Sequence, residues 1–236
     1  MSKMSKITII VPIKNQYQIV QKCLESLERH YKDEEVVMID DGSTEEDLKK
    51  YLSQKCTNNK WKLIQNLVSQ GHILARKQGI AFSSCENIIL LNSDTIVTNN
   101  SLNILCKVLD ENPKIGVCGP STSSISSEQM IRGLYEKRFV LREDEIEKIA
   151  LDLEKNEGII DINLVDGFCL AMKRSVFNEL GGFDEVLRDY GNEKEYEIRC
   201  RRSGWRTVWV RHSFVHYFGL AGGNNGYRLR RKSSGL

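Results

Sequence analysis

Short apolar runs alternate with helix-like segments through the first half of the chain. Five such runs, rich in β-branched residues, lie at 7–11, 36–39, 61–64, 87–91 and 114–118. Between them, apolar residues recur at the three- and four-residue spacing of an amphipathic helix over 17–29, 73–81 and 101–109. Ser43, followed three residues later by Glu46, predicts a capping box that opens one more helix. Strands and helices in this alternation predict βαβ units and a parallel sheet.

The second half of the chain has a different pattern. A Ser/Thr-rich stretch at 121–127 predicts a loop. A charged helix is expected over 142–156, because its first turn is acidic and Gly158 follows its end. Further strands are expected at 159–165, 168–172 and 207–210, and a further helix at 194–202. We therefore predict an α/β protein with a Rossmann-type, mostly parallel but mixed sheet, helices on both faces and an α+β region after it.

Composition narrows the classes of protein to consider. The 236 residues carry a formal net charge of only +2, which gives the whole chain no strong attraction to polyanions. The apolar runs are far shorter than the roughly 20 residues of a membrane-spanning helix, and the first six residues lack the apolar stretch of a signal peptide. Seven scattered cysteines without a Cys-x-x-Cys pair favour a reducing, cytoplasmic location over a disulfide framework or a zinc ribbon.

Polar residues and glycines follow four of the predicted strands. The carboxyl ends of parallel strands meet at the edge where α/β folds bind ligands, so we expect these residues to share one crevice. Asp94 lies three residues after the end of the apolar run 87–91, and a carboxylate there suits a hard divalent cation with the diphosphate it carries. The other strand-end residues are Pro12, Asn15, Asp40, Asp41, Gly42, Gly71, Asn92 and Ser93.

Taken in order, these motifs resemble those of the family 2 glycosyltransferases, which have a GT-A fold. Asn92-Ser93-Asp94 stands at the Asp-x-Asp site of that family, with Asn92 in place of the first aspartate. The resemblance extends over residues 7–219. The remaining matching segments are Ile9–Asn15, Val36–Ser43, Gly71 with Ala75–Ile80, Gly181–Glu185, Asn192–Tyr196 with Arg199, Gly204-Trp205, and His216 with Gly219.

The resemblance implies an inverting glycosyltransferase that moves a sugar from a nucleotide-diphosphate sugar to an acceptor hydroxyl in glycan or glycoconjugate synthesis. The acceptor would be a glycan, a lipid-linked molecule or a protein. Residues 1–120 would bind the donor, residues 121–221 of the same domain would bind the acceptor and supply the base, and 222–236 would form a basic tail. Mn²⁺ or Mg²⁺ would assist departure of the diphosphate.

Roles for individual residues follow from the same resemblance. Asp94, with His216, would hold the metal. Glu193 stands at the position of the catalytic base, and Glu195 is the reserve. The expected donor-binding residues are Pro12, Asn15, Asp40 or Asp41, Gly42, Gly71, Arg76, Asn92 and Ser93, and the expected acceptor-binding residues are Asp166 and Asp184. For Arg76 a solvated helix face is an equal alternative. The alternative for this segment is an ordinary salt-bridged surface helix, with Glu193, Glu195 and Glu197 against Arg199, Arg201 and Arg202.

Two other functions remain as alternatives. A non-catalytic module would keep the fold and only bind a nucleotide sugar. A nucleotidyltransferase should have a Gly-rich loop after its first strand, whereas residues 12–16 contain no glycine. Nucleic-acid binding through the tail residues Arg228, Arg230, Arg231 and Lys232 is disfavoured, because four charges give only weak, salt-sensitive attraction. The tail better suits peripheral contact with the anionic inner face of a membrane or with a lipid-linked acceptor.

Overall fold

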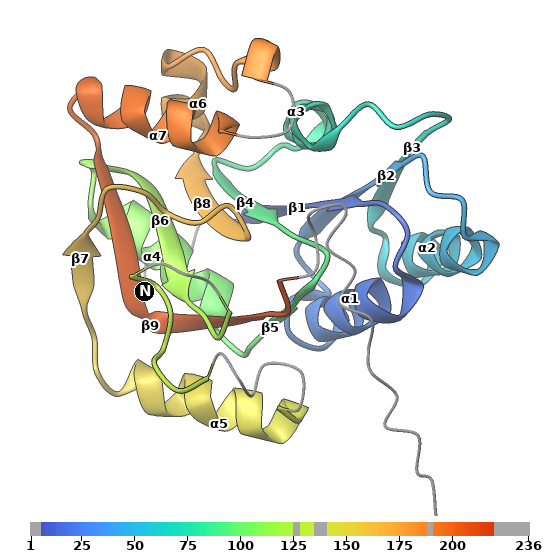
Figure 1. Ribbon diagram of the computed structural model, residues 1–236, viewed down its shortest axis with the longest axis horizontal. Helices are drawn as coiled ribbons and strands as arrows, with labels where there is room; N and C mark the ends of the chain where they lie inside the picture. Colours follow the sequence, from blue (N-terminus) through green and yellow to red (C-terminus); the bar gives the residue numbers. More distant parts are fainter. Residues whose placement is uncertain (1–5, 125–127, 135–140, 188–190, 220–236) are drawn as a thin grey trace, which may run out of the picture.

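The computed structural model describes residues 6–124, 128–134, 141–187 and 191–219, so the predicted basic tail lies outside the described residues. One mixed sheet forms the centre of the molecule (Figure 1). Its strands are β1 (Ile7–Ile13), β2 (Glu35–Asp41), β3 (Lys62–Asn66), β4 (Asn87–Leu91), β5 (Thr95–Val97), β6 (Ile115–Ser121), β7 (Ile159–Asp161), β8 (Cys169–Lys173) and β9 (Arg206–Tyr217). The helices are α1 (Tyr17–Tyr31), α2 (Glu46–Asn59), α3 (His72–Phe82), α4 (Ser101–Glu111), α5 (Glu143–Glu154), α6 (Arg174–Glu179) and α7 (Asn192–Arg202), with a 3₁₀ turn, η2, at Glu185–Leu187.

The strand order joins both halves of the chain in this sheet. The order is β3-β2-β1-β4-β8-β6-β9-β5, and β7 pairs with β9. Strands β1 to β4 are parallel to their neighbours within this group, whereas β8 runs antiparallel to both β4 and β6. The boundary predicted at residue 120 falls within β6, which lies between β8 and β9. Residues on either side of that boundary therefore share one hydrophobic core.

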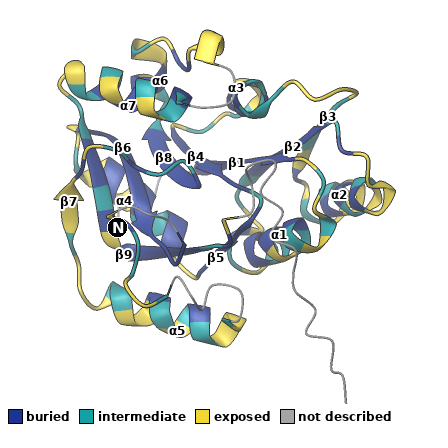
Figure 2. Ribbon diagram, viewed as in Figure 1, coloured by how far each residue is buried: buried dark blue, intermediate teal, exposed yellow. Residues whose placement is uncertain are grey.

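Helices cover both faces of the sheet, as predicted. Residues of α1, α2 and α4 pack with one face, and residues of α3, α6 and α7 pack with the other (Figure 1). Helix α5 packs beside β9 through a third cluster that includes Ile146 and Phe214. The central strands β1, β2, β4, β6 and β8 are largely buried, whereas β7 and the outer helix faces are exposed (Figure 2). The continuous apolar runs of the sequence thus form strands that are covered on both sides.

Several local features differ from the sequence-based expectations. Helix α2 begins at Glu46 without a side-chain cap, because the Ser43 hydroxyl instead accepts a hydrogen bond from the Asn15 backbone N–H at 2.8 Å. Strand β5 was not predicted, and β7 is shorter than the expected 159–165. In the predicted loop 121–127, Ser121 belongs to β6 and residues 121–124 are buried; residues 125–127 lie outside the described residues.

Candidate functional site

The loops after β1 and β2 are tied together at the carboxyl edge of the sheet. Asn15 adopts a left-handed conformation with φ 56°, and its Oδ1 accepts a hydrogen bond from the Thr44 N–H at 2.8 Å. Asp40 Oδ1 accepts from the Ser43 N–H at 2.9 Å. Pro12 is buried in β1 opposite Ile39. The structure therefore brings three predicted donor-binding residues, Pro12, Asn15 and Asp40, to one edge.

Asp41, the second aspartate of the pair, is used to hold the loop before α3. Its carboxylate accepts hydrogen bonds from Asn66 Nδ2 (2.9 Å), Ser69 Oγ (2.7 Å) and the N–H groups of Gln70 (2.7 Å) and Gly71 (3.0 Å). Burial raises the pKa of Asp41, but these bonds outweigh it and leave the pKa below its ordinary value of 3.8. With these acceptor sites taken, Asp40 is the better candidate for contact with a donor.

Gly42 is required beside this loop. Its φ is +73°, and a Cβ at this position would lie 2.7 Å from the Ser69 backbone nitrogen. Neither the conformation nor the space suits a larger residue. Gly42 therefore allows the loops that follow β2 and β3 to approach each other closely.

Replacing Asp41 with asparagine is expected to lower the free energy of unfolding by about 1–3 kcal/mol near neutral pH, because the amide nitrogen cannot accept the hydrogen bonds that one carboxylate oxygen takes. The native pKa of Asp41 is depressed, so its stabilisation is present above the unfolded value of 3.8 and is lost as the pH falls through the native pKa. Urea denaturation of both proteins should show the difference shrinking below about pH 4. A difference that is independent of pH would contradict this role.

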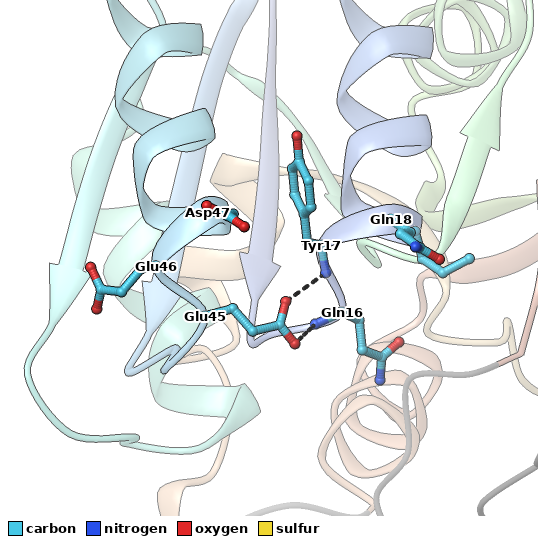
Figure 3. Close-up of a pocket in the computed structure, with 7 residues that line it drawn as sticks. Gln16, Tyr17, Gln18, Glu45, Glu46 and Asp47 are labelled. Carbon is cyan, nitrogen blue, oxygen red and sulfur yellow. Dashed lines mark hydrogen bonds between the residues drawn. The ribbon is translucent and has the colours of Figure 1, made fainter.

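An acidic pocket of about 570 Å³ lies beside these loops, between the amino-terminal ends of α1 and α2 (Figure 3). The Glu45 carboxylate accepts hydrogen bonds from the N–H groups of Gln16 (3.0 Å) and Tyr17 (2.9 Å). It therefore occupies the position at the start of α1 that an anion would otherwise take. Glu46 and Asp47 also line the pocket. Its charge is thus unsuited to a diphosphate.

Arg76, from the middle of α3, is completely buried and connects three separate segments. Its Nη2 donates to Asn92 Oδ1 at 3.0 Å, in the loop after β4, and to the Gly167 carbonyl at 2.5 Å, in the loop before β8. Its Nη1 donates to Glu193 Oε1 at the start of α7. Burial lowers the pKa of Arg76, and the Glu193 carboxylate opposes that shift. The alternative of a solvated helix face was wrong, because the buried guanidinium binds these protein groups and does not face solvent.

The first turn of α7 separates the two candidate bases. Glu193 has one carboxylate oxygen on Arg76, and no described residue donates a hydrogen bond to its Oε2. Glu195 instead forms a bidentate ion pair with Arg199 at 2.8 and 2.6 Å, and Arg199 also binds the carbonyl of Gly182 at 2.7 Å. Glu195 therefore fits the salt-bridged alternative, and Glu193 does not lie on an ordinary surface.

The two predicted acceptor-binding aspartates lie in different surroundings. Asp166 immediately precedes Gly167, whose backbone packs against Glu193, and its N–H donates to Gln129 Oε1 at 2.7 Å. Asp184 is exposed, and its Oδ1 accepts from the Val186 N–H at 2.9 Å, which caps the η2 turn. The structure thus brings Asp166, but not Asp184, into the contact network of Glu193.

Asp94 and His216 come from neighbouring positions at one end of the β5–β9 ladder. Ile96 pairs with His216, and the Phe218 N–H donates to the Asp94 carbonyl at 3.0 Å. The backbone of Asp94, in the turn before β5, thus lies opposite Phe218, two residues along from His216. Asp94 is 1% exposed and His216 is fully buried. Ser93 lies in the turn between β4 and β5, half-buried.

These two residues fit a divalent cation. Ser123 Oγ lies 2.8 Å from His216 Nδ1 and fixes the ring, as groups beside metal-binding histidines do. One carboxylate and one imidazole suit Mn²⁺, with further oxygen ligands from a bound diphosphate. Within the described ranges, no cluster of three or more His, Cys, Asp or Glu side chains forms a cation site.

For Glu197 the salt-bridged surface alternative was wrong, and the sequence did not indicate a role for it in the site. It is fully buried one turn after Glu193, and its Oε2 accepts from the Val165 N–H at 2.6 Å. Burial raises the pKa of Glu197 to about 8; the Val165 hydrogen bond opposes that shift, and nearby Glu193 adds to it. Only its four-residue spacing from Glu193 could have drawn attention to it, because most residues of 193–202 are charged and are typical of a surface helix.

None of the helices in the described part of the chain combines the length and hydrophobicity that crossing a bilayer requires.

Residues 8–181 match the family model described as Glycosyl transferase family 2. The chain is 27% identical over 191 residues to the inactive polypeptide N-acetylgalactosaminyltransferase-like protein 5 of Macaca fascicularis, which covers 76% of this chain and 43% of that protein. It is 23% identical over 180 residues to the poly-beta-1,6-N-acetyl-D-glucosamine synthase of Staphylococcus epidermidis, covering 75% and 42%. The chain thus spans less than half the length of these relatives.

Two solved structures share the fold. GalNAc-T7, solved with UDP, GalNAc and Mn²⁺, has a TM-score of 0.71 at 19% identity, and the match covers 92% of this chain and 44% of that chain. The mannosyltransferase PcManGT of Pyrobaculum calidifontis, solved with GDP-Man and Mn²⁺, has a TM-score of 0.65 at 17% identity, covering 91% and 57%. Both the sequence match and the fold agree with the ordered strand-end motifs, and the chain belongs to glycosyl transferase family 2, with a GT-A fold.

Proposed function

We propose that this chain is a metal-assisted, inverting glycosyltransferase that moves a sugar from a nucleotide-diphosphate sugar to an acceptor hydroxyl, with Glu193 as the base. One observation carries the proposal. The buried Arg76 guanidinium binds both Asn92, two residues before Asp94, and Glu193. A single side chain therefore connects the loop of the candidate metal ligand with the candidate base.

The chain's own residues would divide the chemistry as follows. Asp40, Asn15 and Pro12 hold the nucleotide at the ends of β1 and β2. Glu193 Oε2 accepts the proton of the acceptor hydroxyl as its oxygen bonds to the anomeric carbon and the bond to the diphosphate breaks, which inverts that carbon. Asp166 lies beside Glu193 and orients the acceptor. A divalent cation held by Asp94 and His216 would supply positive charge against the leaving diphosphate.

Thermal shifts with UDP-GalNAc, UDP-GlcNAc and GDP-mannose, each with and without Mn²⁺, test this function. At a hundredfold excess over Kd, a bound donor should stabilise the chain by about 2.7 kcal/mol. NMR of the transferred sugar should show an anomeric configuration opposite to that of the donor. Retention of configuration would exclude the single displacement.

A non-catalytic nucleotide-sugar-binding module is the second candidate. It is favoured by the similarity to a relative whose name describes it as inactive. Such a module would give the thermal shift but neither transfer nor hydrolysis of any donor sugar. If the three donors bind and none of them releases a nucleoside diphosphate, the non-catalytic module is favoured over the enzyme.

Asp94→Asn is expected to remove the Mn²⁺-dependent part of the donor-induced thermal shift and to lower turnover by at least about 100-fold, because metal assistance is worth several kcal/mol. Asp47→Asn is the matched control, since Asp47 is an exposed residue of the acidic pocket. The control should retain both the shift and the turnover. If Asp94→Asn behaved like the control, Asp94 would not be a metal ligand.

A further inference from the structure

Glu197 is a buried carboxyl group that the proposed reaction does not use. It is fully buried on α7, and Val165 N–H donates to its Oε2 at 2.6 Å. No hydrogen-bond partner for its Oε1 occurs among the described residues. Burial of an ionisable side chain without a full set of hydrogen-bond partners lowers the stability of the folded protein, so we expect a structural role of Glu197.

The segment that Glu197 holds is anchored at each of its three residues. Val165 N–H binds Glu197, Asp166 N–H binds Gln129 Oε1 at 2.7 Å, and the Gly167 carbonyl accepts from Arg76 Nη2 at 2.5 Å. Each anchor comes from a different part of the chain. The path of this backbone is thus set from three directions.

Gly167 is in close contact with the candidate base. A Cβ added to Gly167 would lie 2.8 Å from Glu193 Oε1 and 3.1 Å from its carboxyl carbon. The backbone of Gly167 therefore limits the space available to the Glu193 side chain. Glu193 and Glu197 also share a face of α7, four residues apart. A shift of the 165–167 backbone would therefore change both the contact of Gly167 with Glu193 and the hydrogen bond from Arg76 to the Gly167 carbonyl.

We propose that Glu197 is a positioning residue for Glu193, which it serves by holding residues 165–167 against α7. The hydrogen bond to Val165 fixes that segment, Gly167 then confines the Glu193 carboxylate, and the Gly167 carbonyl helps to fix the Arg76 guanidinium that binds it. This role rests on the proposed function only in naming Glu193 as the base. The contacts themselves can be tested without turnover.

The charge state of Glu197 makes the contact depend on pH. The facing groups are Glu193, Tyr196, Cys200 and Arg201 on α7 and Asp166 on the anchored segment. Burial is the main cause that raises the pKa of Glu197 to about 8, and Glu193 and Asp166 add to it. The Val165 hydrogen bond and Arg201 act in the opposite direction. Glu197 is therefore neutral near pH 7. Any opening that exposes it to water is favoured as the pH rises toward 8, because the exposed group ionises more readily.

Hydrogen exchange of the ligand-free protein tests the anchor. In the wild type, the protection factor of the Val165 amide should fall by about tenfold per pH unit between about pH 6 and 7.5, as expected for one linked proton. In Glu197→Gln, which stays neutral and keeps an acceptor, it should change by less than about twofold. An equal pH dependence in both proteins would overturn the proposal.

Two uncharged variants test the effect on the base. Glu197→Gln retains an acceptor for Val165, whereas Glu197→Met keeps the length of the side chain without one. With the donor that gives turnover, kcat of the Met variant should be about tenfold lower at unchanged KM, and kcat of the Gln variant should stay within about twofold of the wild type. Equal kcat values for both variants would overturn the positioning role. If the wild type transfers no sugar, the proposed function fails, and the exchange measurement alone decides whether Glu197 is the anchor.

Discussion

Glu193→Gln is expected to lower kcat by about 10²–10⁴-fold while the KM for the donor changes by no more than about twofold. Glutamine keeps an oxygen for Arg76 Nη1 to bind, so the buried contact survives, but it cannot accept the acceptor's proton. The loss should therefore appear in the chemical step and not in donor binding. Steady-state kinetics with a saturating acceptor measure both constants.

Glu195→Gln is the control for this experiment. Glu195 lies two residues further along α7, pairs with Arg199 and is about one-third exposed. Loss of such a partly exposed pair should cost no more than about 1 kcal/mol of stability and leave kcat within about threefold of the wild type. A Glu193→Gln protein with wild-type kcat, beside a Glu195→Gln protein with a large loss, would transfer the role of base to Glu195.

Arg76→Met is expected to destabilise the protein by about 3–5 kcal/mol, because it leaves a partly buried carboxylate and two buried acceptors without their cation. Urea denaturation near pH 7 measures the change in the free energy of unfolding. Lys77→Met is the matched control at the next position. Lys77 pairs with Glu185 at the surface, so its loss should cost no more than about 1 kcal/mol.

A double-mutant cycle separates the Arg76–Glu193 pair from the other contacts of Arg76. Arg76→Met/Glu193→Met removes both charges, and it should be less destabilised than the sum of the two single variants. Additive effects would show that the pair contributes nothing beyond the separate side chains. Equal stabilities for Arg76→Met and Lys77→Met would show that the buried guanidinium does not hold these segments together.

The central strands could be predicted because burial on both faces leaves a continuous apolar run in the sequence. Strand β4 occupies the predicted 87–91, and β1 and β2 extend the predicted runs by a few residues. Strand β5 and helix α6 were missed because three and six residues are too few to display a period. The predicted capping box failed for a different reason: the Ser43 hydroxyl is taken by Asn15, from a loop 28 residues earlier.

The site was predictable in its location and not in its contacts. Asp40 and Asp41 end β2 and Asp94 comes shortly after β4, and the parallel order of these strands places the three residues at one edge. The sequence alone could not assign Asp41 to loop packing, because its donors come from residues 66–71. Nor could it separate Glu193 from Glu195, which occupy the same charged turn of α7 and differ only in their partners.

By itself, the sequence determined the α/β architecture, the family and the edge of the sheet where the motifs meet, since these depend on local periodicity and on the order of strand-end residues. Only the tertiary structure decided that Arg76 is buried, that it binds Glu193, and that Glu197 anchors the neighbouring backbone. Arg76 and Glu193 are 117 residues apart in the chain. Long-range contacts of this kind leave no local pattern, because burial depends on which segments the sheet brings together.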